Sequence, residues 1–269
     1  PPSTAASLCG KLQFTLSWVF GRIGRACMQP LHHAVDAGLT QAARAALAFL
    51  IEALPDLPPH SIRLERDDRP PIVVWTDGAW EQDGAQQDVG FLIAVPLPGA
   101  PCTDSPASAA HLRRWYTWYH GAGALPQGLR ERFLVRKQYI GQDELVGALT
   151  PYLSLPGLFG EAKVLHFIDN TAALAGLTKG YSRVVDSAHI VHAFHAWNVA
   201  IGAHVWFEYV RSEANPSDEP SRNLELAATL WEVAPGVTSQ PAPMRFPSLE
   251  ELENPAGWMR EARSAGFAL

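Results

Sequence analysis

The sequence predicts an α/β fold in which a mixed sheet is flanked by helices and preceded by a helical segment. Short runs rich in β-branched and aromatic residues occupy the middle of the chain and then alternate with helical patterns. Three strands follow one another directly, which favours antiparallel pairing, whereas helices separate the later strands, which favours parallel pairing. With 269 residues, of which 47% are hydrophobic, the chain can bury a large core and is not disordered.

The beginning of the chain has a helical pattern. Apolar residues recur at helical spacing over residues 7–36, where we expect Gly21 and Gly24 to break the helix and Pro30 to restart it. A second helix is expected from Thr40, a suitable N-cap, to Leu54. These patterns predict helices rather than strands before the first β-branched run.

The middle of the chain carries the strands of the predicted sheet. Asp77 directly follows the first strand, and Asp169 directly follows the fourth. Alternation in the third strand predicts a core face made either by Trp115, Thr117 and Tyr119 or by the residues between them. We expect strands at 71–76, 89–95, 114–119, 163–168 and 205–210, an exposed loop at 96–110, and helices at 142–153, 171–177, 184–201 and 224–233.

Four acidic residues come from four separate predicted elements. Asp77 and Asp169 lie at strand ends, where ligands tend to bind, and Glu144 and Asp218 lie at helix starts. Clustered carboxylates repel one another unless cations occupy the site, and oxygen ligands favour Mg²⁺ or Mn²⁺. Two such ions about 4 Å apart are suited to phosphodiester cleavage. A single Asp at a strand end is more often a turn residue or a helix cap, so the spacing alone is weak evidence for a metal site.

The local sequence around these acids is more specific. The strings WTDGAW (75–80), GQDELVGAL (141–149), FIDNTAAL (167–174) and NPSDEPSR (215–222) resemble, in that order, the four acidic motifs of the ribonuclease H domain of retroelement reverse transcriptases of the DIRS-like and Ty3-like kinds. The resemblance implies a ribonuclease H-like five-stranded mixed sheet and an endonuclease that cleaves the RNA strand of RNA–DNA hybrids with two Mg²⁺ or Mn²⁺ ions. It assigns the catalytic and metal-ligand positions to Asp77, Glu144, Asp169 and Asp218.

The front of the chain is similar to another part of such proteins. SLCGKLQFTLSWVFGRIGRACMQPL (7–31) looks like the thumb-like segment that follows the polymerase palm. The resemblance implies that the rest of a reverse transcriptase polyprotein is a partner, and the start at Pro1 leads us to expect a fragment or a processed piece. We therefore expect a helical thumb or connection-like segment and linker over 1–70, a ribonuclease H-like domain over 71–223, and a C-terminal helix with a Pro-rich acidic tail over 224–269.

Several polar residues near the acids are candidates for contacting a hybrid. Asn170 follows Asp169 and is placed to orient that carboxylate or to contact 2′-hydroxyls. Arg222 is placed to touch a phosphate or to brace the last helix. The basic residues before the Glu144 helix are suited to phosphates, although a solvated charged loop explains them equally. This basic set comprises Arg130, Arg132, Arg136 and Lys137.

Two observations keep a rival function open. The net charge is −6, whereas nucleic-acid binders are usually basic, although two divalent ions would offset about four carboxylate charges. In addition, the stretch before Asp218 has Arg211 but lacks the His found in many ribonuclease H domains. The alternative is a catalytically inactive retroelement-derived fold that serves as an interaction subunit in a protein assembly. A nuclease acting on DNA is a third possibility.

Other functional classes receive less support. His189, His192 and His195 fan too widely around a helix to bind one zinc ion, so we expect a partly buried helix face. Three cysteines form no disulfide framework or zinc motif. No apolar run reaches the roughly 18 residues of a membrane span, and no secretory signal is present, so we expect an intracellular protein, nuclear or cytoplasmic.

Overall fold

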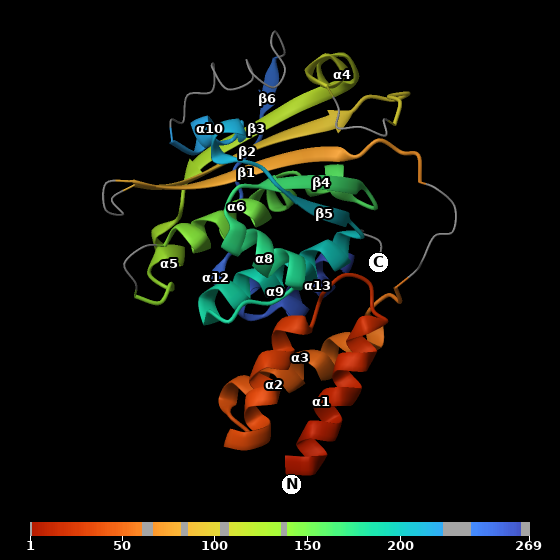
Figure 1. The fold of residues 1–269 in the computed structure, drawn as a ribbon, viewed down its shortest axis with the longest axis vertical. Coiled ribbons are helices and arrows are strands. Elements are labelled where there is room, and N and C mark those ends of the chain that lie inside the picture. Colours follow the sequence, from red (N-terminus) through yellow and green to blue (C-terminus); the bar gives the residue numbers. More distant parts are fainter. Residues whose placement is uncertain are drawn as a thin grey trace. The chain divides into compact units, whose positions relative to one another are not determined.

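The structure, a computed structural model, divides the chain into two compact units. Unit 1 comprises Pro1–Leu64, Gly176–Ile201 and Glu250–Leu269, and unit 2 comprises Glu65–Ala175 and Gly202–Leu249. The structure describes residues 2–60, 67–81, 86–102, 108–135, 139–222 and 238–264. Figure 1 shows the elements of both units. The predicted segment boundaries after residues 70 and 223 stay predictions, and the helix expected at 224–233 lies outside the described residues.

Unit 2 is built on a mixed sheet with the strand order β5-β4-β1-β2-β3-β6 (Figure 1). The β1–β2 and β2–β3 pairs are antiparallel, whereas the β1–β4, β4–β5 and β3–β6 pairs are parallel. The predicted fold class, a mixed α/β sheet flanked by helices, is therefore confirmed. The strands are β1 (Ile72–Glu81), β2 (Gln86–Pro96), β3 (Tyr116–Ala124), β4 (Lys163–Ile168), β5 (His204–Tyr209) and β6 (Ser239–Pro241).

Three strand predictions need correction. Strand β1 continues through Asp77 to Glu81, because its pairing with β2 extends to the end of the hairpin. Strand β3 starts at Tyr116, because α4 (Ala109–Trp115), capped by Ser108, occupies the residues before it. The sheet also has a sixth strand, β6, whose three residues are too few to show an alternating pattern in the sequence.

Aromatic side chains form the core on one face of the sheet. Trp75 lies between Trp118 and Phe167, with ring centroids 5.8 Å and 5.6 Å away and nearly parallel planes. Tyr116 and Trp118 are buried, so they form the core face of β3, and Trp115 lies in α4 instead of on the strand. Of the two faces that alternation left open, the structure thus selects the one that carries Tyr116 and Trp118.

Helices α6 (Ile140–Ser154) and α10 (Asp218–Arg222) lie on opposite faces of the sheet (Figure 1). A Cβ added to Gly78 would come within 2.6 Å of the backbone of α6, and one added to Gly90 would come within 2.4 Å of the backbone of α10. Gly90 pairs with Asp77, the neighbour of Gly78, so the two glycines face opposite sides. Both helices approach the sheet at positions where only glycine leaves room.

The remaining helices that begin in unit 2 are short. Helix α5 (Gln127–Arg130) and helix α7 (Pro156–Phe159) each have four residues, and η3 (Ser212–Ala214) precedes α10. Helix α8 (Thr171–Lys179) follows β4, as the sequence predicts.

Unit 1 is helical. Thr40 caps α3 by accepting a hydrogen bond from the Ala43 amide, as predicted. Pro30, in contrast, does not restart a helix, because α2 begins earlier, at Arg25, and continues through it. The helices are α1 (Pro2–Ser17), α2 (Arg25–Ala37), α3 (Gln41–Ala53), η1 (Leu54–Asp56), α9 (Val185–Ile201) and α13 (Pro255–Ser264), and α12 (Leu249–Glu253) begins at the unit boundary.

The histidines of α9 have a structural role. His195 is buried and His192 is half-buried within unit 1, and the Nε2 atom of His195 lies 2.9 Å from the carbonyl oxygen of Leu177. Burial lowers the pKa of His195 to about 3 and that of His192 to about 4. Both imidazoles are therefore neutral, as expected for a packed helix face. Among the described helices, none combines the length and the apolar character that crossing a bilayer requires.

We predict that Gly78→Ala destabilises the protein by about 1–3 kcal/mol, because the added Cβ would overlap the backbone of α6. Urea unfolding followed by tryptophan fluorescence measures this change. Gly128→Ala is the matched control, since a Cβ there meets nothing within 4 Å. Equal unfolding free energies for the two variants would contradict the close approach.

A second prediction concerns acid stability. Because the pKa of His195 is depressed in the folded state, the unfolded chain binds more protons below its ordinary pKa of 6.5, and stability falls as the pH drops below that value. Between pH 7 and pH 5 this residue should remove about 2 kcal/mol from the unfolding free energy. His195→Gln should lose less stability over this range than the wild type, whereas exposed His33→Gln should behave like the wild type.

Candidate metal-binding site

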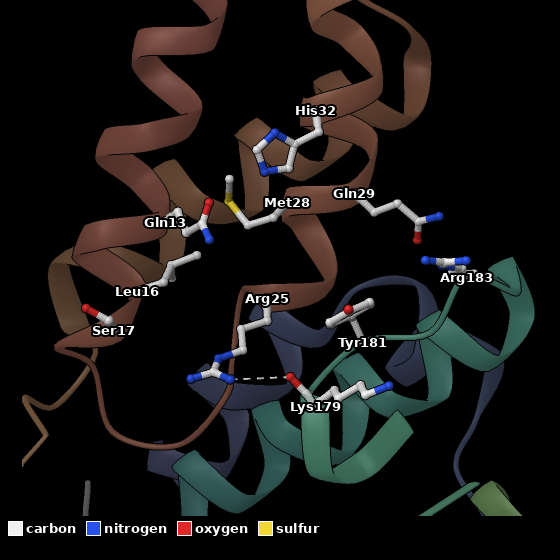
Figure 2. A pocket seen from close by; sticks show the side chains of 10 residues that line it. All are labelled: Gln13, Leu16, Ser17, Arg25, Met28, Gln29, His32, Lys179, Tyr181 and Arg183. Atoms are coloured by element: carbon white, nitrogen blue, oxygen red, sulfur yellow. Dashed lines mark hydrogen bonds between the residues drawn. The ribbon is translucent and has the colours of Figure 1, made fainter. Parts of the chain in front are cut away.

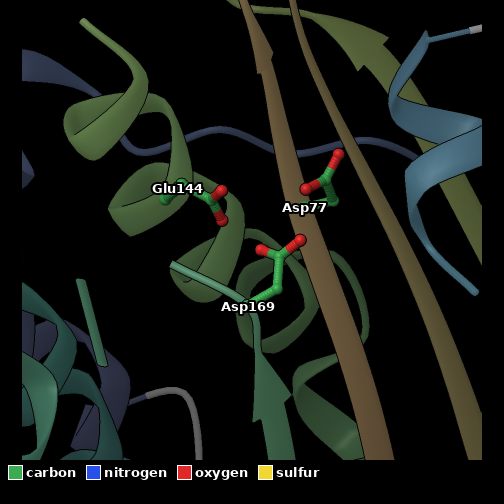
Figure 3. Close-up of side chains that lie close together, drawn as sticks. All are labelled: Asp77, Glu144 and Asp169. Atoms are coloured by element: carbon green, nitrogen blue, oxygen red, sulfur yellow. The ribbon is translucent and has the colours of Figure 1, made fainter. Parts of the chain in front are cut away.

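Three carboxylates from three elements meet in unit 2. Asp77 lies on β1, Glu144 on α6, and Asp169 directly after β4, and their side chains point toward one another (Figure 3). One ligand oxygen from each lies within 4.8 Å of those of the other two. Asp77 is 4% exposed and Glu144 is 3% exposed. Among the residues that the structure describes, this is the one group of three or more potential metal ligands so close together.

Parallel strand pairing brings the two aspartates together. The pairing of β1 with β4 ends at Trp75 and Phe167, and Asp77 and Asp169 each lie two residues farther along their chains. Both carboxylates therefore emerge beyond the last paired residues at the same edge of the sheet. The sequence correctly predicted that Asp77 and Asp169 meet at this edge of the sheet. It was wrong that β1 ends at Asp77, since the strand continues to Glu81.

Helix α6 reaches this edge because Gly78 has no side chain. The close approach at Gly78 positions the first turn of α6, and the Gly78 backbone hydrogen-bonds to the Glu144 carboxylate. The neighbouring Asp143 is also fully buried, but it lies outside the carboxylate group and neither of its carboxylate oxygens has a hydrogen-bond partner. The structure thus brings Glu144, rather than Asp143, to the two aspartates.

The fourth predicted ligand, Asp218, lies outside this group. Its carboxylate accepts a hydrogen bond of 2.9 Å from Nε of Arg222 and forms an ion pair of 2.7 Å with the same guanidinium. Helix α10 nevertheless contacts the site through Ser221, whose hydroxyl donates to the Asp77 carboxylate. The negative charge of Asp218 also contributes to raising the pKa of Asp77. Asp218 is therefore a neighbour of the group rather than a member of it.

The electrostatics of the group favour a bound cation. Burial, and then the charges of Asp169 and Asp218, raise the pKa of Asp77 to about 7, against the opposing hydrogen bond from Ser221. Burial, followed by the charges of Asp77 and Asp169, raises the pKa of Glu144 well above its ordinary value. Oε2 of Glu144 and Oδ1 of Asp169 are buried and have no hydrogen-bond partner among the residues that the structure describes. Unpartnered buried carboxylate oxygens fit a hard divalent cation such as Mg²⁺ or Mn²⁺.

A buried histidine, which sequence reasoning missed, links the three elements that carry the carboxylates. His166 on β4 lies 2.9 Å from the Thr76 hydroxyl of β1 through Nε2 and 3.0 Å from the Tyr152 hydroxyl of α6 through Nδ1. Burial lowers the pKa of His166 to about 3, so the ring is neutral. The only sequence signal is a polar residue inside an otherwise apolar strand, KVLHFI. This network holds β1, β4 and α6 together beneath the site.

The predicted nucleic-acid contacts occupy varied environments. The side-chain oxygen of Asn170 accepts hydrogen bonds of 3.0 Å from the amides of Ala172 and Ala173, so it caps α8. Arg130 donates to the carbonyl oxygen of Leu125, and Arg132 is exposed. Arg222 braces Asp218, one of the two roles expected for it. Arg136 and Lys137 lie outside the described residues, and a nucleic-acid role for all six stays a prediction.

Comparison with known proteins finds a distant structural likeness. No protein-family model matches the chain, and no curated protein matches it. Among solved structures, the chain is similar to the crystal structure of LC9-RNase H1, described as a type 1 RNase H with the type 2 active-site motif. The match covers 74% of this chain and 87% of that one, with 13% identity and a TM-score of 0.40. Such a distant likeness transfers no activity to this chain.

We predict that Mn²⁺ raises the melting temperature of the wild type and leaves that of Asp169→Asn unchanged, because the substitution removes a carboxylate from the group. Without a divalent cation, Asp169→Asn should be at least as stable as the wild type, since a neutral amide replaces one of the three crowded carboxyl groups. Thermal unfolding with and without Mn²⁺ tests both statements. Asp36→Asn, the same change on exposed α2, should retain the wild-type response. Equal Mn²⁺ shifts in wild type and Asp169→Asn would contradict the site.

Proposed function

We propose that unit 2 is a metal-dependent endonuclease that cleaves the RNA strand of RNA–DNA hybrids. The observation that carries this proposal is the group formed by Asp77, Glu144 and Asp169, in which two buried carboxylate oxygens have no hydrogen-bond partner. Hard oxygen ligands gathered at the carboxyl edge of a mixed sheet suit divalent-metal phosphodiester chemistry better than acid–base chemistry at a lone carboxylate.

The three carboxylates would hold Mg²⁺ or Mn²⁺, and Asp218 is proposed as a fourth ligand from the sequence resemblance. When bound, the ions would activate a water molecule and stabilise charge on the phosphate and the leaving oxygen. The chain's own residues set the geometry. Ser221 orients Asp77, the Gly78 backbone orients Glu144, and the Asn170 cap fixes the start of α8 beside Asp169. Such outer contacts position ligands before a cation arrives.

The finer parts of the proposal rest on the sequence motifs. The preference for RNA in a hybrid, the use of two ions and membership in a retroelement reverse transcriptase are supported by the four acidic strings between residues 75 and 222. Arg130, Arg132 and Arg222 are proposed to contact substrate phosphates. We also propose that the protein is located in the nucleus or the cytoplasm.

A second candidate function has an observation of its own. Asp218 is paired with Arg222 instead of joining the carboxylate group, and the chain carries a net charge of −6. Both features suit a retroelement-derived fold that has lost catalysis and serves as an interaction subunit. In this case the chain would neither cleave a hybrid nor require a divalent ion.

Incubating the protein with a hybrid labelled on its RNA strand, in Mg²⁺ or in Mn²⁺, tests the proposal. We predict cleavage by the wild type and by Asp36→Asn, and products at the level of a protein-free control for Asp169→Asn and Glu144→Gln. A labelled DNA duplex run in parallel separates a hybrid-specific enzyme from a DNA nuclease. Absence of cutting by wild type in both ions would favour the inactive subunit, and equal cutting by Asp169→Asn would refute the assigned site.

A further inference from the structure

A positively charged pocket lies within unit 1, separate from the carboxylates. It has a volume of about 600 Å³ and lies between α1, α2 and the segment that follows α8 (Figure 2). Arg25, Lys179 and Arg183 contribute three permanent positive charges to its wall, and His32 adds an imidazole. Of the described residues that line the pocket, none is acidic. The chain as a whole carries a net charge of −6, so this concentration of cations is not a consequence of composition.

A tight turn brings Lys179 to the start of α2. Gly180 has a positive φ of 79°, and its amide donates a hydrogen bond of 2.8 Å to the carbonyl oxygen of Gly176, which ends α8. A Cβ added to Gly180 would lie 2.6 Å from Cβ of Arg22, so the turn approaches Arg22 more closely than another residue would allow. Arg25 also donates a long hydrogen bond, 3.5 Å, to the Lys179 carbonyl oxygen (Figure 2). The cationic wall is thus held by backbone contacts.

The positive charges in this region repel one another. Burial, and then the neighbouring charge of Arg25, lower the pKa of the Arg22 guanidinium. Lys179 and Arg183 are exposed lining residues, whereas the apolar lining residues Leu16 and Met28 are buried (Figure 2). Like charges gathered beside buried apolar residues, without an acidic partner in the wall, are stabilised when an anion binds between them.

We propose that this pocket binds the phosphate backbone of a nucleic acid. Guanidinium and ammonium groups bind phosphate oxygens, and the volume is suited to a nucleotide-sized group. The pocket also offers amide and hydroxyl groups from Gln13, Gln29 and Tyr181 for hydrogen bonds to phosphate or sugar. The choice of nucleic acid among phosphate-bearing ligands rests on the proposed function.

An exposed aromatic pair adjacent in sequence to two pocket residues supports this choice. Phe14 is 66% exposed and Trp18 is 63% exposed, and their rings contact edge to face with centroids 5.9 Å apart. They directly follow Gln13 and Ser17, two residues that line the pocket. Exposed aromatic rings beside a cationic groove are typical of surfaces on which nucleic-acid bases stack, and they are not required for binding a free phosphate ion.

The test is the affinity of the full chain for a fluorescent 12-nucleotide hybrid, measured by anisotropy in EDTA so that neither cleavage nor metal loading contributes. Lys179→Gln/Arg183→Gln removes two exposed cations whose side chains form no hydrogen bond or ion pair with the described part of the chain. We expect at least about tenfold weaker binding and a slope of log affinity against log salt that is smaller in magnitude by about 1.5, corresponding to two lost phosphate contacts.

Lys11→Gln/Arg44→Gln is the matched control, because it removes the same charge from exposed positions of unit 1 outside the pocket. It should bind within about twofold of the wild type, apart from the small effect of net charge. Equal losses in the two double variants, or no loss in either, would overturn the proposal. Unchanged melting temperatures establish that the variants are folded. If the pocket double variant does not fold, Arg183→Gln alone takes its place and should change the salt slope by about half as much.

Two further measurements distinguish a nucleic acid from a free phosphate ligand, and the pocket proposal from the nuclease proposal. Pyrophosphate binding that depends on Lys179 and Arg183, without hybrid binding, would overturn the assignment to nucleic acid. Asp169→Asn should bind the hybrid in EDTA as the wild type does. If hybrid binding depends on the pocket but no cleavage occurs, the nuclease proposal fails alone. If cleavage occurs but the pocket variants bind normally, this inference fails alone.

Discussion

The packing of two buried carboxylates, Asp77 and Glu144, against half-buried Asp169 is the constraint on which the site depends. Desolvation and mutual repulsion both disfavour the ionised state, which is why the pKa of Asp77 rises to about 7 and that of Glu144 rises well above its ordinary value. Only part of this cost is offset by hydrogen bonds, since Oε2 of Glu144 and Oδ1 of Asp169 lack partners. A divalent cation would supply the missing interaction, so the same arrangement that costs stability in the empty protein creates affinity for an ion.

The surrounding fold is organised to hold this arrangement in place. Glycine at Gly78 and Gly90 allows α6 and α10 to reach the sheet from opposite faces, and these helices supply Glu144 and Ser221. Beneath them, the neutral ring of His166 connects β1, β4 and α6 through two buried hydrogen bonds. Because packed interiors change shape little, ligands carried by such elements stay close together even without a cation.

Net charge alone is a poor guide to the partners of this protein. The overall value of −6 combines an acidic group in unit 2 with a cationic pocket in unit 1. A local field depends on which charges are gathered and how far they are desolvated, not on their sum over the chain. An acidic protein can therefore carry both a cation site and a surface that attracts phosphate.

Local patterns in the sequence determined much of the fold: the limits of β4, the Thr40 cap and the mixed pairing of the strands. They also pointed to the three acids that meet in the site, Asp77, Glu144 and Asp169. Local signals failed where pairing overrides them, as in the extension of β1 beyond Asp77 and the short strand β6. Only the tertiary structure separated Asp218 from the other three acids, left specific oxygens unpartnered, and gathered cations from residues 25 and 179–183 into one pocket. Distances between side chains that are remote in sequence depend on how whole elements pack, and no pattern within a single segment encodes them.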